Sequence, residues 1–348
     1  MRFYTAQHQF YCGIDLHARS IYICVMDQAG TILLHKNLPA EPDVLLKAIA
    51  QYRSDVVVAV ECIFTWYWIA DLCTRQGIAF VLGHALYMKA IHGGKTKNDK
   101  IDSQKIAALL RGGMLPMAYT YPQTMRSTRD LLRRRMYLVH QRSELLSHIQ
   151  NTNAQYNCQA FGKKIAYKTN RQGITEVFTD PMVQKSIEVD VQLIDTYHTL
   201  ISNLELEILH RARQHDAICL QLLRSIPGVG KILALVILYE IHNISRFAEV
   251  GNFISYCRLV KYPQESAGKK IGSKNSKIGN VHLKWAFSEA ACLFLRGNEQ
   301  AQRYQQKLVA KYGKSKALTL IAQKLARSAY AMLKRKEPFD LNRFFDNH

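Results

Sequence analysis

The spacing of apolar residues predicts alternating strands and helices in the first third of the chain. Apolar runs rich in β-branched residues indicate strands at residues 10–18, 21–30, 31–39, 56–61 and 78–83. Helical patterns cover residues 43–53 and 66–76, and a further helix is expected to begin within residues 95–105. Three consecutive strands followed by alternating helices and strands predict an α/β domain with a mixed sheet.

Beyond about residue 121 the pattern predicts long helices. One helix is expected over residues 126–150, and in a later helical segment the apolar residues recur at intervals of three and four. These residues are Ile194, Tyr197, Ile201, Leu204 and Ile208. Such spacing is typical of a coiled-coil seam, which serves either an intramolecular helical hairpin or a contact with a second chain.

The last third contains a P-G-V-G turn between two apolar helical segments, within residues 222–241. This pattern favours a helix-hairpin-helix-like motif, in which Gly228 and Gly230 let backbone N–H groups approach a phosphate. A plain connection between two helices is the alternative. A basic segment rich in Gly and Ser follows at residues 263–280, and two further helices are predicted at 281–295 and 317–336.

The charge of the chain indicates the kind of partner it binds. Its formal net charge is +20 over 348 residues, which favours a polyanion, nucleic acid before a membrane surface. There is neither an apolar run of about 18 residues nor a signal peptide, so we expect a cytoplasmic protein. The 8 cysteines form no C-x-x-C pair, and Cys12, Cys24 and Cys62 lie in apolar runs. They are expected to be reduced and buried rather than zinc ligands or disulfides.

Four acidic residues are candidates for one metal site. Asp99 and Asp102 lie three residues apart at the predicted start of a helix, so they face the same way. Asp15 lies in the first strand and Glu61 ends the fourth, and strand ends carry ligand residues in α/β sheets. Converging carboxylates repel one another unless cations neutralise them. Two Mg²⁺ ions about 4 Å apart would do so and would assist phosphodiester cleavage.

Each of these acids also has a structural alternative. Asp15 could form a turn, Glu61 could be a solvated strand end, and Asp99 could cap the helix. Several lysines, including Lys95 and Lys97, lie close to Asp99 and Asp102 in the sequence. Their positive charge favours a site that receives an anionic substrate.

Several motifs resemble one known family. G-I-D at 13–15, V-E at 60–61 and K-N-D-K-I-D-S at 97–103 look like the D-E-D-D set of a RuvC-like nuclease domain. The chain is similar to transposases of the Piv-invertase type, the DEDD recombinases of bridge-RNA-guided insertion sequences. The C-terminal segments S-I-P-G-V-G, Y-C-R-L-V, E-S-A-G-K-K and S-K-I-G-N-V-H-L-K agree with it. Two positions depart from the family pattern: residues 62–64 replace a small turn after the glutamate, and Ser103 stands where alanine is usual.

The resemblance implies a fold, an activity and a set of site residues. It implies an RNase H/RuvC-like catalytic domain at 1–120, a helical coiled-coil segment at 121–215 and a mainly helical transposase domain at 216–348. Asp15, Glu61, Asp99 and Asp102 would hold Mg²⁺, with Mn²⁺ as the alternative ion. Ser266, which on sequence alone lies in an ordinary loop, would attack DNA and form a phosphoserine intermediate. Ser273 and Ser276 are the competing serines, and Tyr256 or Tyr262 is the alternative nucleophile of another type.

The expected partners are donor and target DNA, a guide RNA encoded outside the chain, and further copies of the chain in a dimer or tetramer. Cations of the long helix and of the serine segment are expected to contact nucleic acid. They are Arg126, Arg129, Arg133, Arg134, Arg135, Lys269, Lys270, Lys274 and Lys277.

Three other functional classes fit the sequence less well. A metal-dependent junction resolvase or nuclease without a covalent step does not need the last 200 or so residues. An actin-like sugar kinase also begins with G-I-D, but it needs a glycine soon after that aspartate, and D-L-H-A-R-S has none. For a non-enzymatic nucleic-acid-binding protein, four converging acids would weaken binding.

Overall fold

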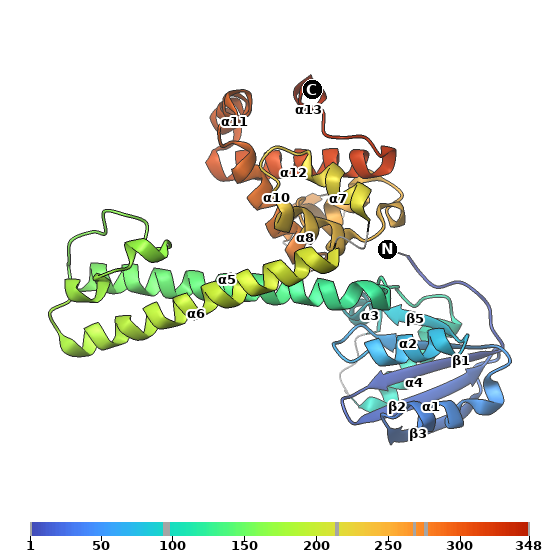
Figure 1. Cartoon of the computed structure of the whole chain (residues 1–348). Coiled ribbons are helices and arrows are strands. Elements are labelled where there is room, and N and C mark those ends of the chain that lie inside the picture. Colours follow the sequence, from blue (N-terminus) through green and yellow to red (C-terminus); the bar gives the residue numbers. More distant parts are fainter. Residues whose placement is uncertain (1, 93–97, 213–215, 267–268, 275–277, 347–348) are drawn as a thin grey trace. The chain divides into compact units, whose positions relative to one another are not determined.

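The computed structural model describes residues 2–92, 98–212, 216–266, 269–274 and 278–346 (Figure 1). It divides into two compact units, Met1–Gln123 and Thr124–His348. The first unit contains an α/β sheet, and the second contains mostly helices. No helix in the described part of the chain is long and apolar enough to cross a lipid bilayer.

A mixed five-stranded sheet forms the centre of the first unit, as the sequence predicts. Its strands are β1 (Phe10–Leu16), β2 (Ser20–Asp27), β3 (Ile32–Pro39), β4 (Val56–Glu61) and β5 (Ala79–Gly83), in the order β3-β2-β1-β4-β5. The first three strands form an antiparallel meander, whereas β4 and β5 run parallel to β1. The five predicted strands and the mixed sheet are therefore confirmed.

Helices cover both faces of this sheet. They are α1 (Pro42–Ala48), the short 3-10 helix η1 (Ala50–Tyr52), α2 (Tyr67–Arg75), α3 (Ala85–His92) and α4 (Asp99–Arg111). Val58 and Val60 of β4 pack in one apolar cluster with Leu72 of α2, while Val57 packs on the other face with Ile106 of α4. Burial on both faces explains why β4 is an uninterrupted apolar run.

The cysteines follow the sequence prediction only in part. Cys12 and Cys24 are buried in the sheet, and all eight cysteines are free thiols. Cys62 is exposed, so its predicted burial is wrong. It lies just beyond the end of β4, where the chain has already left the sheet.

An antiparallel helical hairpin begins the second unit. Helix α5 (Gln123–Gln155) runs beside α6 (Pro181–Ala212), and Arg135 Nη2 of α5 lies 2.6 Å from Glu205 Oε1 of α6 (Figure 1). The predicted seam residues Ile194, Ile201 and Ile208 are buried within the chain. The structure shows the intramolecular hairpin, and a contact of this segment with a second chain stays a prediction.

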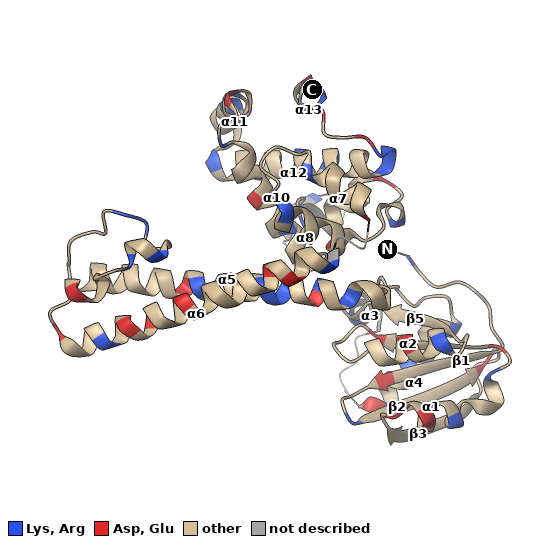
Figure 2. Ribbon diagram, viewed as in Figure 1, with Lys and Arg blue, Asp and Glu red and all other residues tan. Residues whose placement is uncertain are grey.

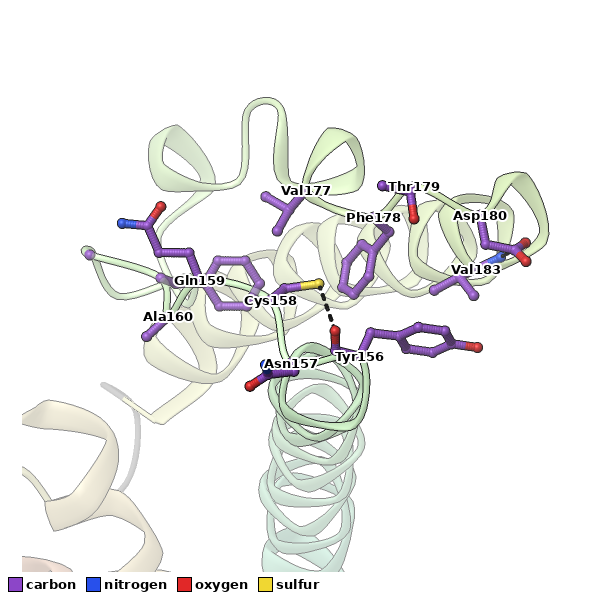
Figure 3. Close-up of a pocket in the computed structure, with 12 residues that line it drawn as sticks. Tyr156, Asn157, Cys158, Gln159, Ala160, Val177, Phe178, Thr179, Asp180 and Val183 are labelled. Atoms are coloured by element: carbon purple, nitrogen blue, oxygen red, sulfur yellow. Dashed lines mark hydrogen bonds between the residues drawn. The ribbon is translucent and has the colours of Figure 1, made fainter.

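Residues 156–180 fold over the tip of this hairpin. Two short 3-10 helices, η2 (Lys168–Asn170) and η3 (Ile174–Val177), lie in this segment. A pocket of about 650 Å³ opens in this segment, and Cys158, Tyr156 and Phe178 are among the residues that line it (Figure 3). The apolar residues of this segment show no helical period, because the segment forms turns and short 3-10 helices rather than a further α-helix.

The remainder of the second unit packs around one apolar helix. Its elements are α7 (Ala217–Arg224), α8 (Lys231–Ile241), η4 (Ile244–Arg246), α9 (Val250–Tyr256), β6 (Tyr262–Ser266), β7 (Lys269–Lys274), α10 (Val281–Phe294), α11 (Glu299–Tyr312), α12 (Lys314–Arg335) and α13 (Leu341–Asp346). Helix α8 is buried from Leu233 to Ile241, and it shares an apolar cluster with α10 and α12. A helix that is apolar all round belongs in such a core.

The P-G-V-G turn joins α7 to α8 and packs closely on α10. Gly228 has a φ of +83°, and a Cβ there would lie 2.6 Å from the carbonyl carbon of Leu293. Gly230 precedes α8 as its N-cap residue, and a Cβ at this position would meet nothing within 4 Å. Helix packing thus accounts for Gly228 without a phosphate, and the phosphate-binding role of this turn stays a prediction.

Candidate functional site

Two of the predicted acids stand on the first turn of α4. Asn98 caps this helix, because its side-chain oxygen accepts a hydrogen bond from the backbone N–H of Lys100 at 2.9 Å. Asp99 is therefore the first residue of the helix and not its cap, and the capping alternative for Asp99 is wrong. Asp102 follows one turn later, and its Oδ1 lies 3.4 Å from Nζ of Lys105.

A histidine joins Asp15 to Asp99. Nε2 of His17 lies 3.4 Å from Oδ2 of Asp15 and 3.3 Å from Oδ2 of Asp99. One ligand atom from each of these three residues lies within 4.8 Å of the others. Carboxylate oxygens and an imidazole nitrogen are all metal ligands, so this donor set fits a divalent cation.

The sequence prediction missed His17. The residue lies two positions after Asp15, just past the end of β1. Because side chains two apart on an extended chain share a face, the D-L-H spacing was the signal that could have revealed it.

The surroundings of Asp15 favour the neutral form of its carboxyl group. Burial is the main reason that the pKa of Asp15 is raised above its ordinary value. His17 lowers this pKa, whereas the negative charges of Asp99 and Asp102 raise it further. Three of the four predicted acids therefore interact electrostatically, which is what a cation would relieve.

Glu61 reaches the same sheet edge from the neighbouring strand. In the parallel register of β1 and β4, Ile14 lies beside Val60, and the next residues along the two strands are Asp15 and Glu61. The structure thus puts both strand-terminal acids at one edge. Among the described residues, neither Glu61 nor Asp102 belongs to the three-residue group formed by Asp15, His17 and Asp99.

A second set of contacts fixes the start of α4 on the sheet. His35 of β3 has its Nε2 2.9 Å from the carbonyl oxygen of Lys100. Ser103 is fully buried, and its hydroxyl donates to the same carbonyl at 2.9 Å. The serine that departs from the family pattern therefore has its hydrogen bond satisfied within the helix. Lys95 and Lys97 lie outside the described residues.

The proposed nucleophile lies on a small β-hairpin. Ser266 ends β6 and Lys269 begins β7, and the two residues pair across the hairpin. Glu265 pairs with Lys270 in the same register. The segment expected to be a loop is thus a two-stranded sheet, whose last residue is Lys274. Lys277 lies outside the described residues.

The arginines of α5 that are predicted to contact nucleic acid differ in their exposure. Arg126 and Arg129 are buried. Arg129 Nε lies 3.0 Å from Glu240 Oε2, and Arg133 Nε lies 2.6 Å from Glu240 Oε1. The predicted nucleic-acid face is therefore interrupted, because Arg126 and Arg129 are buried and a buried carboxylate of α8 pairs with Arg129 and Arg133.

Two further arginines of α5 also make contacts within the chain. Arg135 pairs with Glu205 of α6, and the Arg134 guanidinium lies 5.1 Å from the centroid of the Tyr137 ring. The direct role of the α5 arginines in nucleic-acid binding stays a prediction.

Glu240 is the centre of an internal polar cluster that the sequence prediction missed. Burial alone would raise its pKa, but hydrogen bonds and charges from Arg133 and Arg129 outweigh burial and lower the pKa of Glu240 to about 2. Asn280 Nδ2 also donates to Glu240 at 2.7 Å, while Asn280 Oδ1 caps α10. Glu240 thus ties α5 to the start of α10. A single acid inside the apolar run at 231–241 was the available signal.

Comparison with known proteins places these residues in two matched segments. Residues 12–157 match the DEDD transposase family of the IS110 type, and this segment contains all four predicted acids. Residues 220–306 match the family described as transposase IS116/IS110/IS902, and this segment contains Ser266.

One curated relative is similar along nearly the whole chain. The transposase for insertion sequence element IS1111A from Coxiella burnetii (strain RSA 493 / Nine Mile phase I) is 23% identical over 339 residues. The match covers 94% of this chain and 90% of that protein. The similarity to this relative therefore extends over both matched segments of this chain.

Proposed function

This chain is a transposase of the IS110/IS116 family, and from that premise we propose how its residues cut and rejoin DNA. The proposal is metal-assisted strand cleavage at the edge of β1 and β4, followed by strand exchange through a serine. The observation that supports it most is the meeting of Asp15, His17 and Asp99, with their ligand atoms within 4.8 Å of one another.

The donor set of this edge suits a divalent cation. Asp15, Asp99, Asp102 and Glu61 would hold the ion, with His17 as an additional ligand that the first two acids already contact. When bound, Mg²⁺ or Mn²⁺ would supply positive charge to the phosphodiester oxygens. Because an imidazole ligand suits Mn²⁺ better than Mg²⁺, His17 favours Mn²⁺ as the tighter ion.

The covalent step would belong to Ser266. Its hydroxyl oxygen forms a bond to the phosphorus, and the bond from phosphorus to one DNA oxygen breaks. The proton of the serine hydroxyl passes to the departing DNA oxygen, so the step is a transesterification that needs no other reactant. Lys269, which pairs with Ser266 across the hairpin and is exposed, would hold the phosphate.

Recognition of the DNA would involve a guide RNA and more than one copy of the chain. The net charge of +20 favours binding of both nucleic acids. Exchange between two duplexes needs several cutting sites, which supports a dimer or a tetramer. The second candidate function is a junction resolvase that uses only the metal-assisted step, and the absence of a protein–DNA adduct would favour it.

A calorimetric titration tests the metal site without measuring activity. Mn²⁺ should bind the wild-type protein, and Asp15→Asn should abolish that binding. His17→Ala should weaken it about 10- to 100-fold. Asp43→Asn, which alters an exposed acid of α1, is the matched control and should bind as the wild type does. Wild-type affinity in Asp15→Asn would remove the metal site from the proposal.

A further inference from the structure

A basic groove lies in the last part of the second unit, among α11, α12 and α13. Its volume is about 1250 Å³. Six exposed cations line it: Lys307, Lys311, Arg327, Lys334, Arg335 and Arg343. These residues all follow the segment matched at 220–306, and none of them was a candidate in the sequence. Figure 2 shows Lys and Arg along α12.

The acids of the groove do not balance this charge. Only Glu337 and Asp340 line it among the described acidic residues. Glu337 Oε2 lies 3.6 Å from Arg343 Nη1, and Asp340 Oδ1 accepts a hydrogen bond from the backbone N–H of Arg343 at 3.0 Å. Both acids therefore have partners on α13, and the cations of α11 and α12 keep a positive surface for an anion.

Aromatic rings hold several of the ammonium groups in place. Lys324 Nζ lies 4.9 Å from the centroid of the Tyr304 ring and 5.0 Å from that of Phe344. Lys334 Nζ lies 5.8 Å from the centroid of the Tyr330 ring, whose hydroxyl donates to the carbonyl oxygen of Ala248 at 3.0 Å. Such cation–π contacts orient a lysine without neutralising its charge.

These contacts also indicate which part of a nucleic acid would bind. Bases stack on open aromatic faces, whereas the ring of Tyr312 has both Lys311 and Lys316 over it, at 5.3 Å and 4.8 Å. The aromatic rings of the groove therefore contact lysine ammonium groups, and we do not expect them to stack on bases. Ammonium and guanidinium groups without base contacts recognise phosphates, which carry no sequence information.

We propose that this groove binds the phosphodiester backbone of duplex DNA independently of sequence. The enzyme acts on DNA, and an excess of oriented cations in a groove complements a polyanion. The groove would bind the phosphates of the duplex, and other parts of the protein would recognise the DNA sequence at which cleavage occurs. Its cations come from α11, α12 and α13, so the groove does not depend on the metal ligands of the first unit.

The double variant Arg327→Gln/Lys334→Gln tests this groove in the full-length protein. Binding is measured by fluorescence anisotropy with two duplexes of unrelated sequence, in EDTA, at salt concentrations of about 50 to 200 mM. The Kd should rise about tenfold on both duplexes, and the slope of log K against log salt should become shallower by about 2. The control Lys284→Gln/Lys314→Gln removes two exposed charges of the same unit outside the groove and should keep the wild-type slope.

Three outcomes would overturn the proposal. The groove variant could keep the wild-type slope, or the control could lose as much affinity as the groove variant. Alternatively, the loss could occur only with RNA of the same sequences, which would assign the groove to RNA. EDTA removes divalent ions, so a failure here would leave the metal site untouched.

Discussion

The backbone nitrogen of Ala107 lies 2.3 Å from the position that a Cβ on Gly13 would take. Helix α4 thus rests directly on the backbone of β1, two residues before Asp15. This close approach brings the first turn of α4, with Asp99, to the end of β1. The glycine of the G-I-D motif therefore has a packing role, and the aspartate of the same motif has the chemical one.

Replacement of this glycine should damage both stability and the site. A methyl group in Gly13→Ala would meet backbone atoms of α4, which cannot rotate away, so α4 must shift. We expect a loss of about 1–3 kcal/mol in the free energy of unfolding, measured by chemical denaturation, together with weaker Mn²⁺ binding. Gly251→Ala is the control, since a Cβ there meets nothing within 4 Å. An equally stable Gly13→Ala variant would contradict the packing role.

The buried carboxylate of Glu240 should make stability depend on pH in the acid range. Its pKa in the folded protein is about 2, below the ordinary 4.5, so its ionised form stabilises the fold fully above pH 4.5. That contribution, on the order of 3 kcal/mol, is lost as the pH falls toward 2. Acid unfolding of the wild type followed by circular dichroism measures it.

Substitution of the same residue isolates this effect. Glu240→Gln should lower the free energy of unfolding at pH 7 by about 3–5 kcal/mol, because Arg129 and Arg133 lose their shared partner. It should also flatten the pH dependence between 4.5 and 2. Glu299→Gln, in an exposed pair with Arg303, should change stability by less than about 1 kcal/mol. If Glu240→Gln and Glu299→Gln change the free energy of unfolding by the same amount, the buried cluster around Glu240 does not stabilise the fold.

Mixing two inactive variants should reveal whether chains share a site. Asp102→Asn lacks a metal ligand and Ser266→Ala lacks the nucleophile, so each variant alone should be inactive. If the acids of one chain act with the serine of another, mixed oligomers contain some intact pairings and regain part of the recombination activity. The recombined DNA is the measurement. No recovery in mixtures whose mixed oligomers are confirmed would show that each chain completes its own site.

The pattern of apolar residues was sufficient to predict the strands of the first unit from sequence. Its strands are β-branched runs, and the run at β4 is buried on both faces, so each strand and the mixed sheet could be predicted. The hairpin β6–β7 could not, because its Gly, Ser and Lys residues show no alternation of apolar positions. The short helices α3 and α9 were also missed, because so few residues do not show a clear helical spacing of apolar positions.

Distant pairing limited the prediction of the site. Arg129 and Glu240 are 111 positions apart, so the charged side of α5 was predicted to contact nucleic acid although a buried acid pairs with two of its arginines. The acids were easier to place, because Asp15 and Glu61 end neighbouring strands and Asp99 begins a helix. His17 was missed because its contacts with Asp15 and Asp99 depend on how α4 packs on β1.

Cleavage by Asp15→Asn tests the central claim most directly. The substitution removes one charge and keeps the size of a half-buried side chain, so the fold should persist by circular dichroism. With Mg²⁺ or Mn²⁺ present, single-turnover cleavage of DNA that carries the element ends should fall at least about 100-fold relative to wild type and to Asp43→Asn. Cleavage by Asp15→Asn at the wild-type rate would contradict a metal-assisted site at the end of β1.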